Sequence, residues 1–371
     1  FNGDATLQND LEVGGDLDVT GGLTVGGSPV GTGVLSPVTE NSKTGVRLST
    51  TVAANYGDIG SEAVDLSYSS IASSTVGATG DYSISMGKST TASGSSSTSM
   101  GYDATASGSV STAMGQSTTA SGSNSTAMGV NTTASGGAST AMGSYTTASG
   151  SVSTAMGEYT TASGGASTAM GYYSNASGNA STAIGVLLNA SDAGSMVIGS
   201  NNLVGSTLTS GGSATAFNAA NAAFVIGNGD PTGSASDAFV VYFNGDATLS
   251  GDLTINSDER LKDNIQPLGS TLNKLHQIEG KTYSFKKDEE HTPKIGVLAQ
   301  EVQLVFPELV NEGADGILSV NYQGLVPVLI NAINEQEVKM SEQDVKIAAL
   351  EEMVRFLAVQ QSQTTSSVAA N

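Results

Sequence analysis

The sequence predicts a mainly β fibrous protein. We expect a parallel β-roll or solenoid of 14-residue repeats in a homotrimer, followed by an α+β domain and a trimeric coiled coil. An apolar residue followed by Gly recurs every 14 residues, nine times, from Met86-Gly87 to Ile198-Gly199. The tripeptide Ala-Ser-Gly recurs half a period later. After Asn256 the repeat gives way to charged, helix-forming sequence that contains a heptad pattern.

Each repeat reads roughly STAMGxxTTASGxx and holds two short β-compatible segments, each ending in a turn with Gly. A helix is excluded, because Gly and Ser would interrupt it every seven residues. One repeat therefore makes one turn of a solenoid, whose backbone pairs with the next turn at ~4.8 Å. We expect the Met/Ile column to point inward as one ladder and the Ala of Ala-Ser-Gly to form another. So thin a coil buries little apolar surface, and we expect it to associate laterally.

Shorter β segments flank the repeats. The heptapeptide FNGDATL occurs twice, at residues 1–7 and 243–249. Gly-Asp-Leu patterns follow each copy, and their alternation with turn residues predicts short strands. We therefore expect a β-stalk over residues 1–39 and a β neck or stalk over 201–256. Two strands are predicted inside the neck, near residues 223–227 and 238–242.

The overall charge and composition exclude several classes of function. The chain has 13 Lys and Arg against 34 Asp and Glu, which gives a net charge of −21. Nucleic-acid phosphates and anionic lipid repel such a chain, so we expect no nucleic-acid partner. The absence of Cys excludes disulfides, thiolate metal sites and Cys nucleophiles. No apolar run approaches the ~18 residues of a membrane span, so we expect no membrane insertion.

The repeat STAMGxxTTASG resembles the head domain of trimeric autotransporter adhesins of the YadA type. The sequence just before the repeats, over residues 54–67, is also similar to the segment that leads into such heads. The resemblance covers about residues 40–200, which we assign as a YadA-like β-roll head. It implies left-handed parallel β-rolls, three side by side.

The C-terminal part has the pattern of a globular domain followed by a long helix. A helix is predicted over 271–279, a strand over 281–285, and a longer helix from near Tyr322. From Val326 a heptad is readable, which predicts a coiled coil. Its a positions are Val326, Ile333, Met340, Ile347 and Val354, and its d positions are Leu329, Gln336, Gln343, Leu350 and Leu357. We assign residues 336–371 to the coiled coil and a disordered tail.

The runs 257–265 and 296–302, with the helix from Tyr322, resemble the C-terminal intramolecular chaperone auto-processing domain of phage endosialidases, tail fibres and neck appendages. We place this chaperone domain at 257–335. In that family the domain trimerises, drives folding of the upstream β-fibre and then cuts itself off. The resemblance implies Ser257 as nucleophile, Lys262 as its base, and cleavage of the Asn256–Ser257 bond. Such an enzyme is a single-turnover serine self-peptidase with a Ser-Lys dyad, without turnover on an external substrate.

Ser257 has a structural alternative. Ser followed by two acidic residues is also a good helix N-cap. In a helix, a spacing of five places two side chains ~140° apart, so Ser257 and Lys262 meet only if Ser257 precedes the first turn. Lys262 also has to lose its charge, because a free Lys with a pKa of ~10.4 cannot accept a proton at neutral pH. Burial in a trimer interface would achieve this, provided that Asp258 and Asp263 point to solvent or to Arg260.

Other candidate sites are less specific. His276 and His291 lack partner patterns and read as surface or structural residues. Asn228, Asp230 and Asp237 carry oxygens for Ca²⁺, but turn formation explains them better. Within one head no glycan-hydrolase pair of carboxylates can form, because Asp103 and Glu158 lie four turns apart, ~19 Å along the solenoid. A site made between chains stays open. We therefore expect no cofactor and no metal.

Together these features predict a structural and adhesive trimeric fibre of a virion, a tail fibre or appendage for host attachment. Its expected partners are copies of itself and a host cell-surface receptor, either a glycan or a protein. One alternative is a bacterial surface trimeric adhesin on the extracellular cell surface. We expect the virion instead, because an adhesin of that class should end in a membrane-anchoring β-barrel. A glycan-degrading tailspike is a weaker alternative.

Overall fold

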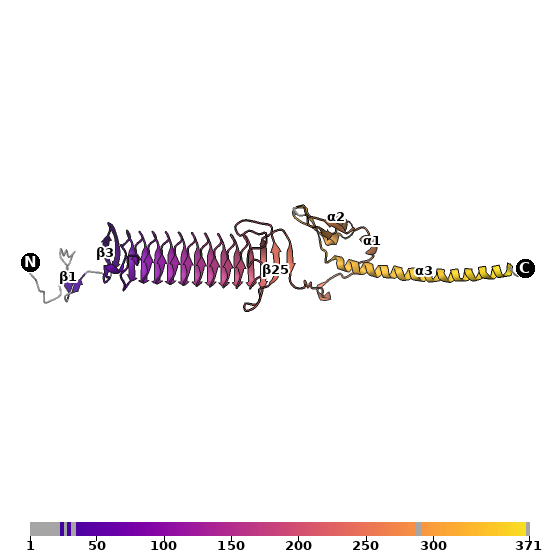
Figure 1. Cartoon of the computed structure of the whole chain (residues 1–371), viewed down its shortest axis with the longest axis horizontal. Helices are drawn as coiled ribbons and strands as arrows, with labels where there is room; N and C mark the ends of the chain where they lie inside the picture. Colours follow the sequence, from indigo (N-terminus) through magenta and orange to yellow (C-terminus); the bar gives the residue numbers. More distant parts are fainter. Residues whose placement is uncertain (1–22, 26–27, 31–34, 287–290, 369–371) are drawn as a thin grey trace, which may run out of the picture. The chain divides into compact units, whose positions relative to one another are not determined.

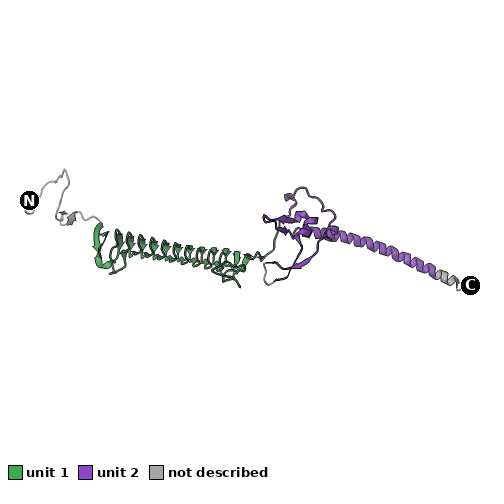
Figure 2. Ribbon diagram, turned by 90° about the horizontal axis from the view of Figure 1, so that it is seen from above, with its two compact units in different colours: residues 1–254 green, residues 255–371 purple. Residues whose placement is uncertain are grey.

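The computed structural model describes residues 23–25, 28–30, 35–286 and 291–368. The chain divides into two compact units, residues 1–254 and 255–371, shown in green and purple in Figure 2. Most of the β-stalk expected over residues 1–39 lies outside the described residues. Inside it, β1 (Leu23–Val25) and β2 (Ser28–Val30) form an antiparallel pair.

The repeats of the first unit form a β-solenoid of about eleven turns (Figure 1), which confirms the predicted solenoid of 14-residue repeats. A regular turn contributes a five-residue strand to one parallel sheet and a two-residue strand to a second. Successive copies pair in register, so that Met114 lies opposite Met128. The long strands are β5 (Val64–Tyr68), β7 (Ile84–Lys88), β9 (Thr98–Tyr102), β11 (Thr112–Gln116), β13 (Thr126–Val130), β15 (Thr140–Ser144), β17 (Thr154–Glu158), β19 (Thr168–Tyr172), β21 (Thr182–Val186), β23 (Met196–Ser200) and β24 (Ala222–Asn228). The short strands are β6 (Gly77–Ala78), β8 (Thr91–Ala92), β10 (Thr105–Ala106), β12 (Thr119–Ala120), β14 (Thr133–Ala134), β16 (Thr147–Ala148), β18 (Thr161–Ala162), β20 (Asn175–Ala176) and β22 (Asn189–Ala190).

The interior of the solenoid is lined by Ala rather than Met. Ala120, from Ala-Ser-Gly, is fully buried like its copies, so this predicted ladder is confirmed. The prediction of an inward Met ladder is wrong. Met114 follows the fully buried Ala113 in one strand, and alternation turns its side chain outward, where it is 38% exposed. The remaining inward positions of the turn are Ser111 and Thr118, so this interior holds only small side chains.

The Gly after each Met is required by the backbone. Gly115 has φ of +129°, a conformation that L side chains rarely adopt. A Cβ at this position would also lie 2.0 Å from the carbonyl oxygen of Gly129 in the next turn. The 14-residue spacing of Gly is therefore the spacing of a close contact between turns.

The long strands belong to the larger of the two sheets, called here the large sheet. Antiparallel strands flank the parallel strands at both ends of this sheet. At the start these are β3 (Leu35–Glu40) and β4 (Lys43–Leu48), followed by a short 3₁₀ turn, η1 (Ala53–Asn55). At the other end β25 (Asp237–Tyr242) pairs with β24, and β26 (Ala247–Leu249) pairs with β25. The two strands predicted inside the neck are therefore confirmed as β24 and β25.

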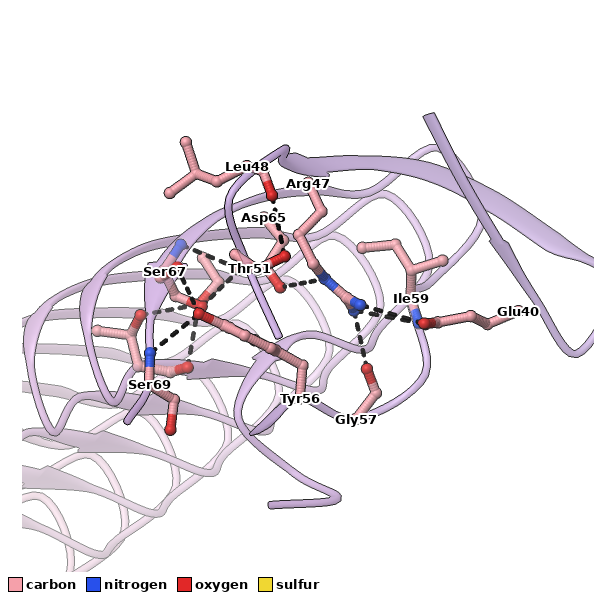
Figure 3. A network of polar contacts seen from close by, with 12 residues as sticks. Glu40, Arg47, Leu48, Thr51, Tyr56, Gly57, Ile59, Asp65, Ser67 and Ser69 are labelled. Atoms are coloured by element: carbon pink, nitrogen blue, oxygen red, sulfur yellow. Dashed lines mark hydrogen bonds and ion pairs between the residues drawn. The ribbon is translucent and has the colours of Figure 1, made fainter. Parts of the chain in front are cut away.

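A buried Arg47 connects β4 to the first turn of the solenoid (Figure 3). Its Nε lies 3.1 Å from the Asp65 carboxylate and its Nη1 lies 3.1 Å from that of Glu40. Its Nη2 donates to the carbonyl of Gly57 at 2.9 Å, and the Tyr56 ring lies 5.0 Å away. Removing Arg47 would leave the fully buried Asp65 carboxylate without an ion-pair partner, at a cost of about 3–5 kcal/mol. This network therefore holds the start of the solenoid together.

The second unit combines short elements with one long helix. Its core joins Val302, Phe306 and Val328, which are nearly or fully buried. Helix α1 covers only part of the predicted stretch 271–279. The elements are η2 (Glu259–Leu261), α1 (Leu272–Leu275), β27 (Lys281–Tyr283), β28 (Lys294–Gly296), α2 (Ala299–Val305), η3 (Pro307–Leu309), β29 (Val310–Glu312), β30 (Leu318–Val320) and α3 (Leu325–Val368).

Helix α3 carries the whole heptad pattern. It extends to Val368 and so includes most of the tail that we expected to be disordered. Every residue at the predicted a and d positions is exposed in the single chain. The coiled coil stays a prediction, and these exposed apolar residues are consistent with it. No helix among the described residues combines the length and apolarity that a membrane crossing needs.

Candidate functional site

The two side chains implied as a dyad are in direct contact. Nζ of Lys262 donates a hydrogen bond to Oγ of Ser257 at 2.7 Å. Both residues lie at the start of the second unit, in an exposed segment whose described regular structure before α1 is the single turn η2. The structure thus places a hydroxyl and an amine together, next to the Asn256–Ser257 peptide bond.

A turn capped by Asp258 produces this contact. The Asp258 carboxylate accepts from the backbone N–H of Arg260 at 2.9 Å, and from the Arg260 guanidinium at 2.9 and 2.7 Å. The N-cap of η2 is therefore Asp258, and the alternative that Ser257 caps a helix is wrong. Because η2 is one 3₁₀ turn that ends at Leu261, the α-helical separation of positions five apart does not apply to Ser257 and Lys262.

The acidic neighbours of Lys262 are engaged elsewhere. Hydrogen bonds from the side chain and backbone of Arg260 lower the pKa of Asp258, and the same contact raises the pKa of Arg260. The Asp263 carboxylate accepts from the backbone N–H of Asn264 at 2.9 Å. Asp258 therefore points to Arg260, as we required for Lys262 to act as a base. The other condition, burial of Lys262, is not met within one chain, because Lys262 is exposed.

A polar clasp connects the segment after the dyad to α3. The Glu335 carboxylate accepts from the backbone N–H of Thr271 at 2.6 Å and from the hydroxyl of Ser270 at 2.9 Å. Asn331, one helical turn earlier, donates to the Gly269 carbonyl at 2.6 Å and to Glu335 at 3.0 Å. The hydrogen bonds from Thr271, Ser270 and Leu272, first that of the Thr271 N–H, lower the pKa of Glu335. Sequence reasoning missed this clasp, since its only local signal is the four-residue spacing of Asn331 and Glu335.

The remaining acidic candidates have structural partners. Asp237 accepts from the backbone N–H groups of Leu203 and Val204 at 2.9 and 2.7 Å, as expected for loop formation. Asp230 accepts from the N–H of Thr232 within a turn. Asp192 is buried and binds the N–H of Ala222 at 2.7 Å. Among the residues that the structure describes, no group of three or more His, Cys, Asp and Glu could hold a metal ion.

Two families match parts of the chain. The YadA head domain repeat matches seven overlapping segments between residues 78 and 186. The family described as chaperone of endosialidase matches residues 257–311, which begin at Ser257 and include Lys262. The chain therefore carries YadA head repeats followed by a chaperone of endosialidase domain, as the sequence resemblances predicted.

The chain is also similar to phage proteins named long tail fiber protein Gp37. It is 30% identical over 122 residues to that of Salmonella phage S16, and 38% identical over 97 residues to that of Escherichia phage AR1. The first match covers 30% of this chain and 16% of the relative, and the second covers 24% and 9%. A third relative, from Enterobacteria phage K3, is 31% identical over 100 residues. The matches therefore span less than a fifth of each relative.

Proposed function

We propose that this chain belongs to a trimeric virion fibre, a tail fibre or appendage for host attachment, whose C-terminal domain directs its assembly. The observation that carries this proposal is the occurrence of YadA head repeats and a chaperone of endosialidase domain in one chain. The similarity to phage long tail fibre proteins supports the virion over the surface of a bacterium. The host receptor is a glycan or a protein of the cell surface.

Two uncovered apolar surfaces support association of copies. The outward column of the large sheet includes Met114, Met142 and Ile184, which are 38–39% exposed. The a and d residues of α3 form the second surface. A second and third copy of the chain would cover both surfaces. In a parallel trimer the apolar column and the heptad of each chain face the same residues of the other two chains.

The repeats create an assembly problem that a chaperone domain would solve. Consecutive turns are nearly identical, so a pairing between chains that slips by one turn loses few contacts. Many misassembled forms then compete with the native trimer. A C-terminal trimer that holds the three chains in register removes this ambiguity. The domain at 257–335 and α3 follow the repeats in the sequence, which is the position that this role needs.

We propose further that the chain cuts itself between Asn256 and Ser257. Neutral Nζ of Lys262 takes the proton of the Ser257 hydroxyl, and Oγ forms a bond to the carbonyl carbon of Asn256. The C–N bond then breaks and the proton passes to the Ser257 nitrogen, which leaves an ester between Asn256 and Ser257. Water hydrolyses this ester, so the products are an Asn256 carboxylate and a Ser257 with free amine and hydroxyl. The 2.7 Å contact supports the first step.

Assembly would switch this reaction on. In one chain Lys262 is exposed to water. The apolar side chains of Ile255, Leu261 and Ile265 are also uncovered. Packing of these side chains against neighbouring copies would remove Lys262 from water, and removal from water favours the neutral amine that a base requires. After the cut the trimer cannot unfold and refold by the same route, so its stability becomes kinetic.

Intact-mass measurement on freshly folded protein tests the cut. We expect fragments 1–256 and 257–371 from the parent chain, and an uncut, folded trimer from Ser257→Ala and Lys262→Ala. Lys262→Arg should not restore cleavage, because a guanidinium stays charged. Ser284→Ala, which removes a hydroxyl elsewhere in the domain, should cleave normally. A persistent full-length chain in a correctly assembled parent trimer would refute self-cleavage alone.

The assembly proposal has its own test. Light scattering should give a trimer for the intact chain, and a stable monomer would contradict the fibre. Residues 1–256 expressed alone should be insoluble or heterogeneous. If they formed the same trimer in the same yield, the chaperone role would be wrong.

A further inference from the structure

A column of exposed Tyr side chains lies on the C-terminal half of the solenoid. Tyr145, Tyr159 and Tyr173 stack on one another, with ring centroids 4.8 and 4.5 Å apart and interplanar angles of 10° and 15°. Tyr172 meets Tyr173 edge-on, at 4.6 Å and 79°. These four residues, called here the Tyr column, keep 37–49% of their surface exposed. A contiguous exposed aromatic patch is typical of a binding surface.

The solenoid does not need these rings in order to fold. Tyr145, Tyr159 and Tyr173 follow the long strand at the turn position with φ near +50°, and Ser117 and Asn131 occupy this position in earlier turns with the same φ. Small polar residues suit such a turn at least as well as Tyr. The Tyr column is therefore an addition to the repeat, confined to three consecutive turns.

The charge around the Tyr column restricts its ligand. The sequence holds no Lys, Arg or His between Lys88 and Arg260. Glu158 precedes Tyr159 and is exposed. An anionic ligand such as a sulfated or phosphorylated glycan would meet no positive charge in this part of the chain and one carboxylate. The ring faces within the stack contact one another, so a ligand meets the ring edges and the phenol oxygens. A neutral sugar fits this surface, because its hydroxyls bond the phenol and carboxylate oxygens and its C–H groups contact the ring edges.

We propose that the Tyr column is a docking site for a neutral oligosaccharide of the host cell surface. The inference rests on the proposed host-attachment function and assigns that attachment to turns β15 to β19 of the head. The occupant is recognised by hydrogen bonds to Glu158 and the phenols and by contact with the exposed ring edges, without ion pairing. A cationic peptide would use the same surface through its charge, and a second copy of the chain would cover it.

Saturation-transfer NMR on the assembled full chain tests the proposal, with neutral gluco-, manno- and galacto-hexaoses as probes. We expect at least one of them to bind, and Tyr145→Ser, Tyr159→Ser and Tyr173→Ser combined to weaken it at least tenfold. Tyr102→Ser, which removes an exposed Tyr from another part of the same sheet, is the matched control and should bind normally. Tyr159→Phe should retain the stack and lose only part of the binding.

Three results would overturn the docking site. These are no binding of any neutral hexaose at millimolar concentration, equal binding by the triple variant, and stronger column-dependent binding of oligo-lysine. Nitration of the assembled trimer with tetranitromethane supplies an independent readout. Modification of Tyr145 and Tyr173 is expected, whereas complete protection of the column would mean that a second copy covers it. A trimer that assembles normally in these experiments leaves the fibre proposal standing when the sugar proposal fails.

Discussion

Asp258 and Arg260 form a two-residue clamp near the start of the C-terminal unit. The Asp258 carboxylate receives both guanidinium hydrogen bonds, at 2.9 and 2.7 Å, and the backbone N–H of Arg260. This clamp closes the turn η2, and the closed turn brings Lys262 back to Ser257. Asp258 is thus a positioning residue for the proposed cut.

Loss of the clamp should slow self-cleavage without preventing assembly. Asp258→Ala removes both the cap and the ion pair, and we expect the fragment 257–371 to appear at least about tenfold more slowly. Asp258→Asn keeps an N-cap acceptor and should lie closer to the parent rate. A time course of intact mass, with light scattering to verify the trimer, gives both readouts. Parent-like kinetics in Asp258→Ala would show that the turn forms without the clamp.

The direction of the Met column predicts opposite effects for two neighbouring substitutions. Ala127→Asp places a carboxylate in the dry interior and should unfold the solenoid, at a cost of more than about 3 kcal/mol. Met128→Asp points outward and should leave the turns folded but weaken association of the chains. Circular dichroism measures whether each variant folds, and light scattering measures whether it assembles. Met128→Leu is the control, and a fully assembled Met128→Asp trimer would exclude the Met column from the interface.

Buried hydroxyl groups in the interior predict a stabilising substitution. The Thr132 hydroxyl is buried without a hydrogen-bond partner, whereas the equivalent Thr90 pairs with Ser85 Oγ at 2.8 Å. Thr132→Val removes an unsatisfied polar atom and should stabilise the solenoid by about 1 kcal/mol. Thr90→Val breaks a hydrogen bond and should destabilise it by about as much. Thermal unfolding compares the pair, and equal shifts of the same sign would contradict this interpretation.

The clasp at Glu335 predicts a pH dependence of the C-terminal domain. Hydrogen bonds from Thr271 and its neighbours lower the folded-state pKa of Glu335 below its ordinary 4.5. The stabilisation is therefore complete above that value and is lost as pH falls through the lowered folded pKa. The protection of residues 269–275 against hydrogen exchange, measured relative to the intrinsic rate at each pH, should fall over that acid range in the parent chain. Glu335→Gln should exchange faster already at neutral pH and respond less to acid, and an unchanged acid response would assign the effect to another group.

The period of the sequence was sufficient to predict the solenoid but not the direction of its side chains. Neighbours along a strand point to opposite faces, so a shift of one residue exchanges the interior for the exterior. We predicted that Met points inward because it is the more apolar residue of each Ala-Met pair. The interior is instead built from side chains as small as Ala113 and Thr118. The Met column is free to face another chain.

The candidate dyad was identified from its resemblance, while its geometry came from the fold. Local sequence placed Ser257 and Lys262 five residues apart, which separates them in an α-helix. Only the turn capped by Asp258 brings them to 2.7 Å. The clasp between Thr271 and Glu335 was beyond sequence reasoning, because 64 residues separate its members.

What the sequence determined by itself is the repeat architecture, because a Gly every 14 residues records a backbone contact that no other residue tolerates. It also determined the change of composition after Asn256 and the heptad of α3, since composition and periodicity are local properties. The tertiary structure alone decided which column faces inward, which residue caps the turn before Lys262, and that three Tyr side chains stack. These depend on the width of the coil and on contacts between residues far apart in sequence, where side-chain size and direction outweigh hydrophobicity.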